Sequence, residues 1–506
     1  MTTTQAGNTA YRVASPRRGT DLPALRWQPL AVVLLADGAL LGGTVNNYGY
    51  DRDELYFRIL AAHPGWGYVD QPPLTPLLAR AGIALFGDTL WGIRVPALVC
   101  ALVTVWLTVV LTRELGGGGA AQTLAAIGVS STFLFIAGHV LLTATPDMVV
   151  WLLVILFATR SLRRGQPRWW LAVGLSVGLG LYNKQLVALL LVGLAGGLLI
   201  AGPRRELANR WLWGGAAIAL LIGAPNLIYQ ILNGWPEVTM AGVISSHKGA
   251  DDRALFVPFQ LILLGLTAVP IWAAGLLHLF RDPGWRPLRG LAWAYPLIAL
   301  IVLATGGQPY YTFGLLTFLY SAGCVVTARW AAGHLGRWVW TGAAVATGSA
   351  FAVLVALPLI PVNALPTAVA TINQTARDSI GWPAYVGQIA TVYRSLPAAE
   401  QTHTVVITQN YGEAGAVDRF GPAMGLPHVF SGQNQLFLLG RPPQDTTTVI
   451  AVGLDDPDRQ FHTCTRSGSL DNQVGVANEE QGRPITICRG PILAWTQLWP
   501  TFQHYD

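Results

Sequence analysis

Long apolar segments joined by short connections fill the chain between residues 29 and 360 and restrict what it can fold into. Over all 506 residues, 52% are hydrophobic and only 11% are charged, whereas about 25% of the residues of a soluble globular protein are charged. A helix needs roughly 17–25 apolar residues to cross a bilayer. The sequence therefore predicts a mainly α-helical, polytopic membrane bundle of about eleven spans. We place these spans at residues 29–46, 92–112, 121–140, 144–162, 169–183, 185–201, 211–231, 255–278, 290–305, 310–328 and 338–360.

Arginine marks every second connection between these predicted helices. Because positively charged loops stay on the cytoplasmic side of a membrane, this alternation predicts a cytoplasmic N-terminus. Residues 1–28 are then a basic, disordered cytoplasmic tail, and the apolar run that follows is interpreted as an uncleaved signal anchor. The loops 47–91 and 232–254 are predicted to be extracytoplasmic. The arginines of the cytoplasmic set are Arg113, Arg160, Arg163, Arg164, Arg168, Arg204, Arg205, Arg210, Arg281, Arg286, Arg289, Arg329 and Arg337.

The composition changes after the last apolar segment. Residues 29–361 are predicted to form the transmembrane catalytic domain, and residues 362–506 a small extracytoplasmic α/β domain. Alternating runs at 404–408 and 448–452 predict strands, and 413–420 is a candidate helix between them. Cys464 and Cys488 lie in this region, where a disulfide is permitted. Their spacing does not establish a bond, so their pairing is left open.

Three carboxylates, Asp51, Asp53 and Glu54, lie within four residues at the start of the first outer loop. Asp51 and Glu54 have the spacing of a capping box, in which each side chain accepts a bond from the other's backbone N–H. Glu54 and Arg58 have the spacing of an ion pair on a helix surface. Neither device needs Asp53. Ionisable groups near a membrane are often functional, so we interpret Asp53 as catalytic, with Glu54 beside it.

A carboxylate at this place suits the transfer of a sugar to a hydroxyl acceptor. A base must take the acceptor's proton while its oxygen attacks the anomeric carbon. One carboxylate suffices for a single inverting displacement, whereas a retaining double displacement needs two, roughly 5 Å apart. We expect two amphipathic helices in the loop, over residues 51–62 and 73–86. Trp66, Tyr68 and Trp91 are expected at the level of the lipid headgroups.

Asp147 and Lys184 lie at the predicted outer ends of apolar segments. Asp147 either stabilises the start of its helix or lines the same cavity as Asp53, where it and Asp51 would orient the acceptor or a metal ion. A lysine between two apolar runs is costly unless it is paired or snorkels to the interface. Lys184 therefore either does so or binds the phosphate of a donor as a point charge.

Basic residues of the outer loops are not explained by the orientation rule, so they are candidates for binding an anion. His247, Lys248 and Arg253 of the loop 232–254 form either a mobile phosphate clamp or part of a solvated charged loop. Arg58 is a further candidate for the donor phosphate. The sequence has no HExxH, CxxC or Walker pattern, so zinc-protease and NTPase functions lack their parts.

Four stretches, in this order, resemble motifs of the GT-C membrane glycosyltransferases, specifically the group of protein O-mannosyltransferases and lipid A aminoarabinose transferases. The stretch 50–57 resembles the acidic motif of the group's first loop, and 145–148 is similar to its second acidic motif. The stretch 178–184 looks like its glycine-then-lysine motif. The stretch 307–311 resembles a Lys-Pro-x-Tyr motif, but Gln308 stands where a lysine is common, which weakens a phosphate role for this position.

The tail adds two more similarities to bacterial members of this group, at residues 410–415 and 430–434. The resemblance implies a polyprenyl-phosphate-linked sugar donor, an extracytoplasmic active site and inversion at the anomeric carbon. It places Asp53 at the position of the catalytic base, and it also carries over Asp147 and Lys184. We expect a groove for donor and acceptor lined by Tyr56, Tyr68, Gln71, Tyr310 and Tyr311.

We therefore predict a hexosyl- or pentosyltransferase of the cell (inner) membrane with a lipid, glycan or protein acceptor and no nucleic-acid partner. No cofactor is assigned, and dependence on a divalent metal is left open. One alternative is a transporter or flippase for lipid-linked sugars, which should show interrupted helices in matching halves and charges at mid-membrane. Another is a non-catalytic protein of envelope-glycan assembly whose C-terminal domain does the recognition.

Overall fold

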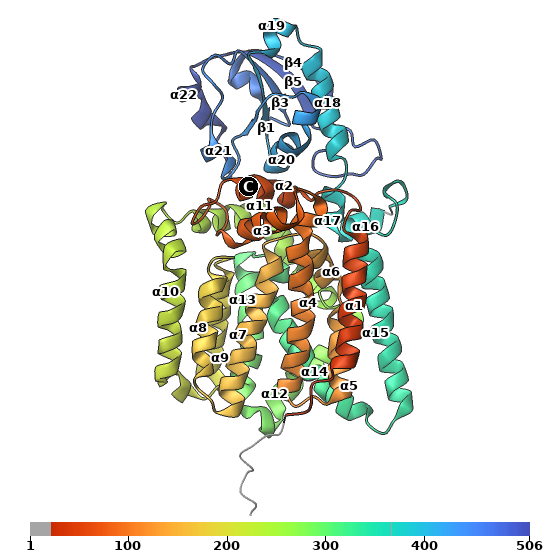
Figure 1. Cartoon of the computed structure of the whole chain (residues 1–506). Helices are drawn as coiled ribbons and strands as arrows, with labels where there is room; N and C mark the ends of the chain where they lie inside the picture. The colour runs from red at the N-terminus through yellow and green to blue at the C-terminus, as the bar shows by residue number, and fades with distance from the viewer. Residues whose placement is uncertain (1–21, 366, 506) are drawn as a thin grey trace, which may run out of the picture.

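The computed structural model describes residues 22–365 and 367–505, and its main body is a bundle of helices that run side by side (Figure 1). Helices α2 (Arg52–Ala62), α3 (Leu74–Phe86) and α11 (Pro236–Ile262) lie at one end of this bundle, next to an α/β domain (Figure 1). Most of the predicted tail 1–28 lies outside the described residues. The helices of the bundle are α1 (Trp27–Thr44), α4 (Leu90–Glu114), α5 (Gly119–Val129), α6 (Thr132–His139), α7 (Ala144–Arg164), α8 (Trp169–Gly180), α9 (Leu186–Ala201), α10 (Arg210–Leu232), α12 (Val269–Arg281), α13 (Arg289–Thr305), α14 (Phe313–Ala331) and α15 (Leu335–Ala356).

The predicted count of about eleven membrane helices is not confirmed. Among the described residues, six helices are long and apolar enough to cross a membrane, or up to eight if each of two bent pairs is one span. Helices α8 and α9, predicted over 169–183 and 185–201, have only 12 and 16 residues. The segment predicted as one helix over 121–140 is the pair α5 and α6, bent by 60°. These apolar helices nevertheless form a multi-pass membrane bundle.

The predicted loop 232–254 and the predicted helix 255–278 are both wrong. Helix α11 (Pro236–Ile262) runs through most of that loop and starts at a proline, which suits a first helical turn because its missing N–H is not needed there. The chain then bends by 68° into α12. Gly265 lies at this bend with φ +87°, a conformation that glycine adopts without strain. The basic residues of this region therefore lie on a helix.

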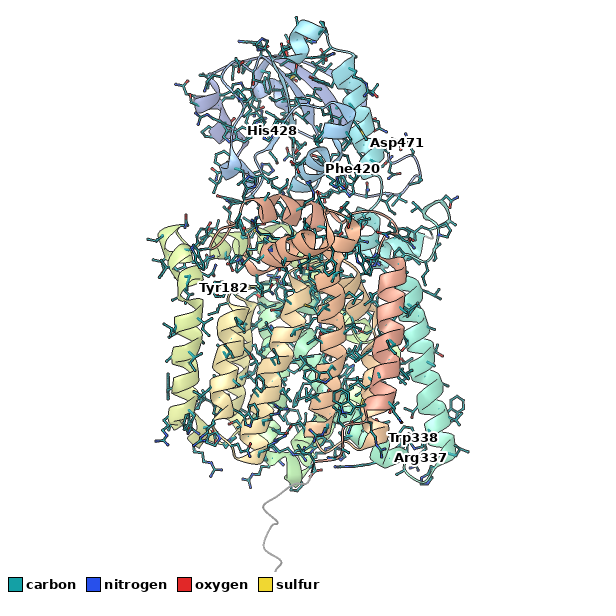
Figure 2. All side chains as sticks on the ribbon, viewed as in Figure 1. Tyr182, Arg337, Trp338, Phe420, His428 and Asp471 are labelled. Atoms are coloured by element: carbon teal, nitrogen blue, oxygen red, sulfur yellow. A yellow bond between two sulfur atoms is a disulfide. The ribbon has the colours of Figure 1, made fainter. Side chains whose placement is uncertain are left out.

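Arginine side chains gather where α4 and α7 end, away from the α/β domain. Arg160 and Arg164 form ion pairs with the buried carboxylate of Glu114, and Arg163 donates to its carbonyl at 2.5 Å. Arg337, near the start of α15, marks the same end of the bundle in Figure 2. The bundle therefore has an arginine-rich end and an end that carries the α/β domain.

The two helices predicted in the first outer loop are confirmed as α2 (Arg52–Ala62) and α3 (Leu74–Phe86). Their apolar faces do not pack on the bundle alone. Leu55 and Leu60 of α2 belong to one buried cluster with Tyr385 of α18 (Trp382–Arg394) and Ala414 of α20 (Tyr411–Phe420). The first loop and the α/β domain therefore share a hydrophobic core.

The α/β domain is built on a five-stranded sheet with the order β2-β1-β3-β5-β4. Strand β1 pairs in parallel with β2 and β3, whereas β5 pairs antiparallel with β3 and β4. The predicted strands 404–408 and 448–452 are confirmed. Cys464 and Cys488 face each other across β4 and β5 and form a disulfide. The strands are β1 (Thr404–Thr408), β2 (Val429–Ser431), β3 (Thr448–Val452), β4 (Phe461–Ser469) and β5 (Pro484–Pro491).

Candidate active site

At the start of α2, two of the three clustered carboxylates form hydrogen bonds that cap the helix. The Asp51 side chain accepts a bond from the backbone N–H of Asp53 at 2.9 Å, and the Glu54 side chain accepts one from the N–H of Asp51 at 3.0 Å. The predicted capping box is therefore confirmed. Burial, followed by the charges of Asp53 and Glu54, raises the pKa of Asp51 well above its usual value. Asp53 takes no part in the box through its side chain.

The predicted ion pair between Glu54 and Arg58 is wrong. Glu54 is fully buried and pairs with Arg94 of α4, whose Nη2 lies 2.9 Å from Oε2. Arg58 points the other way and forms ion pairs with Asp88 and Asp418. Packing decides between the two arginines, because Glu54 faces α4 whereas Arg58 lies between Asp88, which follows α3, and Asp418 of the C-terminal domain. The ion pair of Glu54 with Arg94 thus anchors the start of α2 to α4.

A cavity of about 930 Å³ lies between α2, the connection of α8 and α9, α11 and the C-terminal domain. Asp53, Asp70 and Glu237 are the carboxylates of its lining, and Lys184 and Arg253 are its cations. A cavity with both charge types near one another can bind an anionic group and still present a base. Its other polar lining residues include Tyr56, Gln71, Asn183, Gln185, Gln230, Tyr311, Tyr411 and Asn434.

Two tyrosines donate hydrogen bonds to carboxylates that line this cavity. The hydroxyl of Tyr411 donates to Oδ1 of Asp53 at 2.8 Å, and the Tyr411 ring stacks on Tyr56 with centroids 4.7 Å apart. The hydroxyl of Tyr56 donates in turn to Oδ1 of Asp70 at 3.0 Å. Burial raises the pKa of Asp70 to about 7. Near neutral pH, Asp70 is therefore partly protonated.

Lys184 lies between α8 and α9 with its ammonium group next to two tyrosines. Its Nζ is 3.4 Å from the hydroxyl of Tyr310 and 4.8 Å from the ring centroid of Tyr311. Asp147 does not line the large cavity; together with both tyrosines it lines a separate small one. Tyr311 lines both cavities. Asp147 is therefore not among the residues that line the cavity with Asp53.

The large cavity brings together only some of the predicted site residues. Tyr68, for example, bonds the carbonyls of Leu60 and His63, whereas His247 and Lys248 are exposed on α11 outside the cavity lining. The predicted residues inside the lining are Asp53, Tyr56, Gln71, Lys184, Arg253 and Tyr311. Those outside it are Asp51, Glu54, Arg58, Tyr68, Asp147, His247, Lys248 and Tyr310.

Sequence reasoning missed Asp70, Glu237, Tyr411 and Asn434 as lining residues. Glu237 is held by Gln230, whose Nε2 donates to Oε1 at 2.7 Å. The sequence does mark the position of Tyr411. Asn410 and Glu413 have the spacing of a capping box, which indicates that a helix starts at Tyr411. Among the described residues, no group of three or more His, Cys, Asp or Glu side chains can hold a metal ion. They therefore offer no clustered ligand set for the divalent metal left open above.

The sequence is similar to those of known lipid-dependent sugar transferases. Residues 70–229 match the family described as dolichyl-phosphate-mannose-protein mannosyltransferase. The undecaprenyl phosphate-α-4-amino-4-deoxy-L-arabinose arabinosyl transferase 1 of Pseudomonas fluorescens (strain Pf0-1) is 26% identical over 315 residues, covering 58% of this chain and 54% of the relative. The protein of the same name from strain Pf-5 is 32% identical, covering 53% and 52%. The chain thus spans about half the length of these relatives.

The fold is similar to that of ArnT from Cupriavidus metallidurans, solved in complex with undecaprenyl phosphate. The TM-score is 0.58 at 16% sequence identity, over 90% of this chain and 97% of that one. Arabinofuranosyltransferase AftD from mycobacteria gives a TM-score of 0.51 at 15% identity, over 93% of this chain and 42% of that one. The resemblance predicted from the motifs is thereby confirmed, and so is the predicted fold class.

Proposed function

We propose that this chain, which has the GT-C fold, is a membrane glycosyltransferase that moves a sugar from a polyprenyl-phosphate donor to a hydroxyl acceptor. One observation carries the proposal: a single cavity holds the carboxylate of Asp53 together with two cations, Lys184 and Arg253. A carboxylate can take a proton from a hydroxyl, and ammonium and guanidinium groups bind phosphate. The relatives named for an undecaprenyl-phosphate-linked sugar support a donor of this kind.

The reaction then proceeds as a single displacement. Asp53 accepts the proton of the acceptor hydroxyl while that oxygen bonds to the anomeric carbon. The bond between this carbon and the phosphate oxygen breaks, and its electron pair leaves with the polyprenyl phosphate. Lys184 and Arg253 stabilise the charge that builds up on the phosphate. One displacement inverts the configuration at the anomeric carbon.

The apolar part of the cavity lining suits the lipid tail of the donor. Leu186 and Leu189 come from α9, and Val238 and Ile244 come from α11. Val238 is 65% exposed, and we propose that this side of the cavity opens to the bilayer. The first prenyl units would lie against these four side chains, with the phosphate directed to the cations.

The site is proposed to face the extracytoplasmic side of the cell (inner) membrane, with the N-terminus in the cytoplasm. The arginine-rich end of the bundle supports this orientation, and the bond between Cys464 and Cys488 suits an oxidising compartment. The names of the relatives favour a pentose such as 4-amino-4-deoxy-L-arabinose as the sugar. The acceptor is a lipid, a glycan or a protein.

Mass spectrometry of lipids and envelope glycans from a deletion strain tests this function. We expect the lipid-linked donor to accumulate and one sugar to disappear from an envelope component. The wild-type protein should reverse both changes and Asp53→Asn neither, while the control Asp445→Asn, at an exposed carboxylate of the C-terminal domain, should act like the wild type. Unchanged lipids and glycans in the deletion strain would contradict the function. Recovery by Asp53→Asn would contradict only the assignment of the base.

A further inference from the structure

Tyr411 belongs to the C-terminal domain, yet its hydroxyl donates to Asp53, which lies 358 positions earlier in the chain. We propose that Tyr411 is a positioning residue, which holds the carboxylate of Asp53 toward the acceptor and makes transfer depend on the docked C-terminal domain. The inference rests on the proposed function, because it assigns a role relative to the proposed base.

The backbone of Tyr411 is fixed just after strand β1. Asn410 follows β1 and caps α20, where its side chain accepts a bond from the N–H of Glu413 at 2.8 Å. The carboxylate of Glu413 in turn accepts a bond from the N–H of Asn410 at 3.2 Å, which completes a capping box. The N–H of Tyr411 itself donates to Oε1 of Gln433 at 2.6 Å. The Cα–Cβ bond of Tyr411 therefore has a set direction.

The ring of Tyr411 is also held. It stacks on Tyr56 at an interplanar angle of 28°, and the guanidinium of Arg52 lies 4.9 Å from its centroid. Arg52 is itself ion-paired with Glu479 of the C-terminal domain. The two ring contacts and the bonded backbone fix the position of the Tyr411 hydroxyl. The hydroxyl can therefore act as a fixed hydrogen-bond donor to a neighbouring carboxylate.

The bond to Oδ1 orients the carboxylate and leaves Oδ2 for the acceptor proton. Without it, the Asp53 side chain can rotate, and a misplacement of about 1 Å can cost 10²-fold in rate. The ionised carboxylate also loses a donor that favours it. The charged and titratable groups that act on Asp53 are Asp51, Arg52, Asp70 and Tyr411. Only Tyr411 among them both bonds Asp53 through its side chain and belongs to the other domain.

Steady-state transfer by the purified full-length protein tests the proposal, with the donor lipid that accumulates in the deletion strain as substrate. Tyr411→Phe removes the hydroxyl and keeps the stacked ring. We expect kcat to fall about 10- to 100-fold and the KM for the donor to stay within about twofold, since the lost interaction acts on the base rather than on donor binding. The acid limb of the pH–rate profile should move to higher pH.

Three comparisons separate positioning from a general structural effect. Tyr393→Phe removes a hydroxyl that bonds the carbonyl of Gln401 in the same domain, and it should keep wild-type rates. Added to Asp53→Asn, Tyr411→Phe should change the residual rate little, because its effect passes through Asp53. A ring-fluorinated tyrosine at position 411 keeps the side-chain shape and strengthens the donor, so it should move the acid limb to lower pH even if the phenylalanine variant folds poorly.

Wild-type kcat and pH profile in Tyr411→Phe would overturn the inference, as would an unmoved profile with the fluorinated residue. A raised KM with unchanged kcat would also overturn it, since Tyr411 would then contact the substrate instead. An active Asp53→Asn variant contradicts the proposed base itself. Unchanged lipids and glycans in the deletion strain contradict the proposed function, and neither of these two outcomes is one that overturns the role of Tyr411.

Discussion

Arg94 and Glu54 form a two-pronged ion pair whose side chains are 1% and 0% exposed. Nε and Nη2 of Arg94 donate to the two oxygens of Glu54, each at 2.9 Å. The remaining N–H groups of Arg94 contact the carbonyls of Val45 and Gly49 and Nε2 of His139. Because Glu54 also closes the capping box of α2, this pair fixes the first turn of α2, and with it Asp53, to the helix bundle.

Replacing Arg94 with methionine should destabilise the protein strongly. The carboxylate of Glu54 would stay buried without its partner, which costs about 3–5 kcal/mol. We expect a lower melting temperature in detergent and a lower transfer rate, because α2 loses its anchor. The control is Arg80→Met, which removes an exposed side chain that only bonds the carbonyl of Ala61. Equal melting temperatures for the two variants would contradict this role of Arg94.

Features that depend on neighbouring residues could be predicted from the sequence. The capping box of Asp51 and Glu54, the helices over 51–62 and 73–86 and the strand over 404–408 each result from local spacing or alternation. The structure confirms them because packing favours the same conformations. Local spacing also indicates that Asp53 takes no part in capping the helix, since the other two of the three carboxylates form the capping bonds within one helical turn.

Features that depend on distant packing could not be predicted. Glu54 had a basic residue at helical spacing, but the fold pairs it with Arg94, 40 positions away. The polar composition of 232–254 indicated a loop, although Pro236 starts a helix there. The contact of Tyr411 with Asp53 joins residues 358 positions apart, and no spacing rule covers such a pair.

Lys184→Met should weaken binding of the donor phosphate. The variant keeps an unbranched side chain among the tyrosines but removes the positive charge from the cavity. We expect the Kd for undecaprenyl phosphate to rise about 10- to 100-fold, because a charge-assisted hydrogen bond contributes about 1.5–3 kcal/mol. Microscale thermophoresis in detergent measures this. Lys248→Met, on the exposed side of α11, should bind as the wild type does, and the same affinity in both variants would remove Lys184 from the phosphate site.

Asp70→Asn should change the pH dependence of stability. Burial raises the pKa of Asp70 from 3.8 to about 7, so the folded protein holds this proton more tightly than the unfolded chain does. The stabilisation is complete below about pH 4 and is lost as the pH rises to about 7. Relative to the wild type, the melting temperature of Asp70→Asn should therefore rise between pH 5 and pH 8 on the order of several degrees. The exposed Asp445→Asn should show a constant difference, and a constant difference for Asp70→Asn would refute the prediction.

Loss of the disulfide should destabilise the C-terminal domain. Cys464 and Cys488 close a loop across a separation of 24 residues, and a bridge of this size contributes about 3 kcal/mol by limiting the unfolded chain. The double variant Cys464→Ser/Cys488→Ser should be cleaved faster by protease in this domain than Cys100→Ser, which removes a free cysteine of α4. Equal cleavage rates would show that the paired strands hold without the bond.

Gly415→Val should disturb the contact between α20 and α2. A Cβ atom on Gly415 would lie 2.7 Å from Cβ and 2.8 Å from the carbonyl carbon of Leu55, and a helix backbone does not yield as a flexible side chain does. Overpacking of this kind costs about 1–3 kcal/mol. The strain would be relieved by moving α20, which carries Tyr411, away from α2, which carries Asp53. We therefore expect transfer to fall at least as far as in Tyr411→Phe, while the melting of the sheet itself changes little.

Gly387→Ala is the matched control for this variant, because a Cβ atom on Gly387 of α18 meets nothing within 4 Å. It should keep wild-type transfer and gain slightly in stability, by about 0.5–1 kcal/mol, because alanine favours a helix over glycine. Transfer rates and cross-linking between cysteines placed on α2 and α20 measure the two effects separately. If Gly415→Val breaks the cross-link but transfers at the wild-type rate, the base works without the docked domain. If the cross-link and transfer are lost together, transfer depends on the packing of α20 against α2 at Gly415, which keeps Tyr411 of the C-terminal domain next to Asp53.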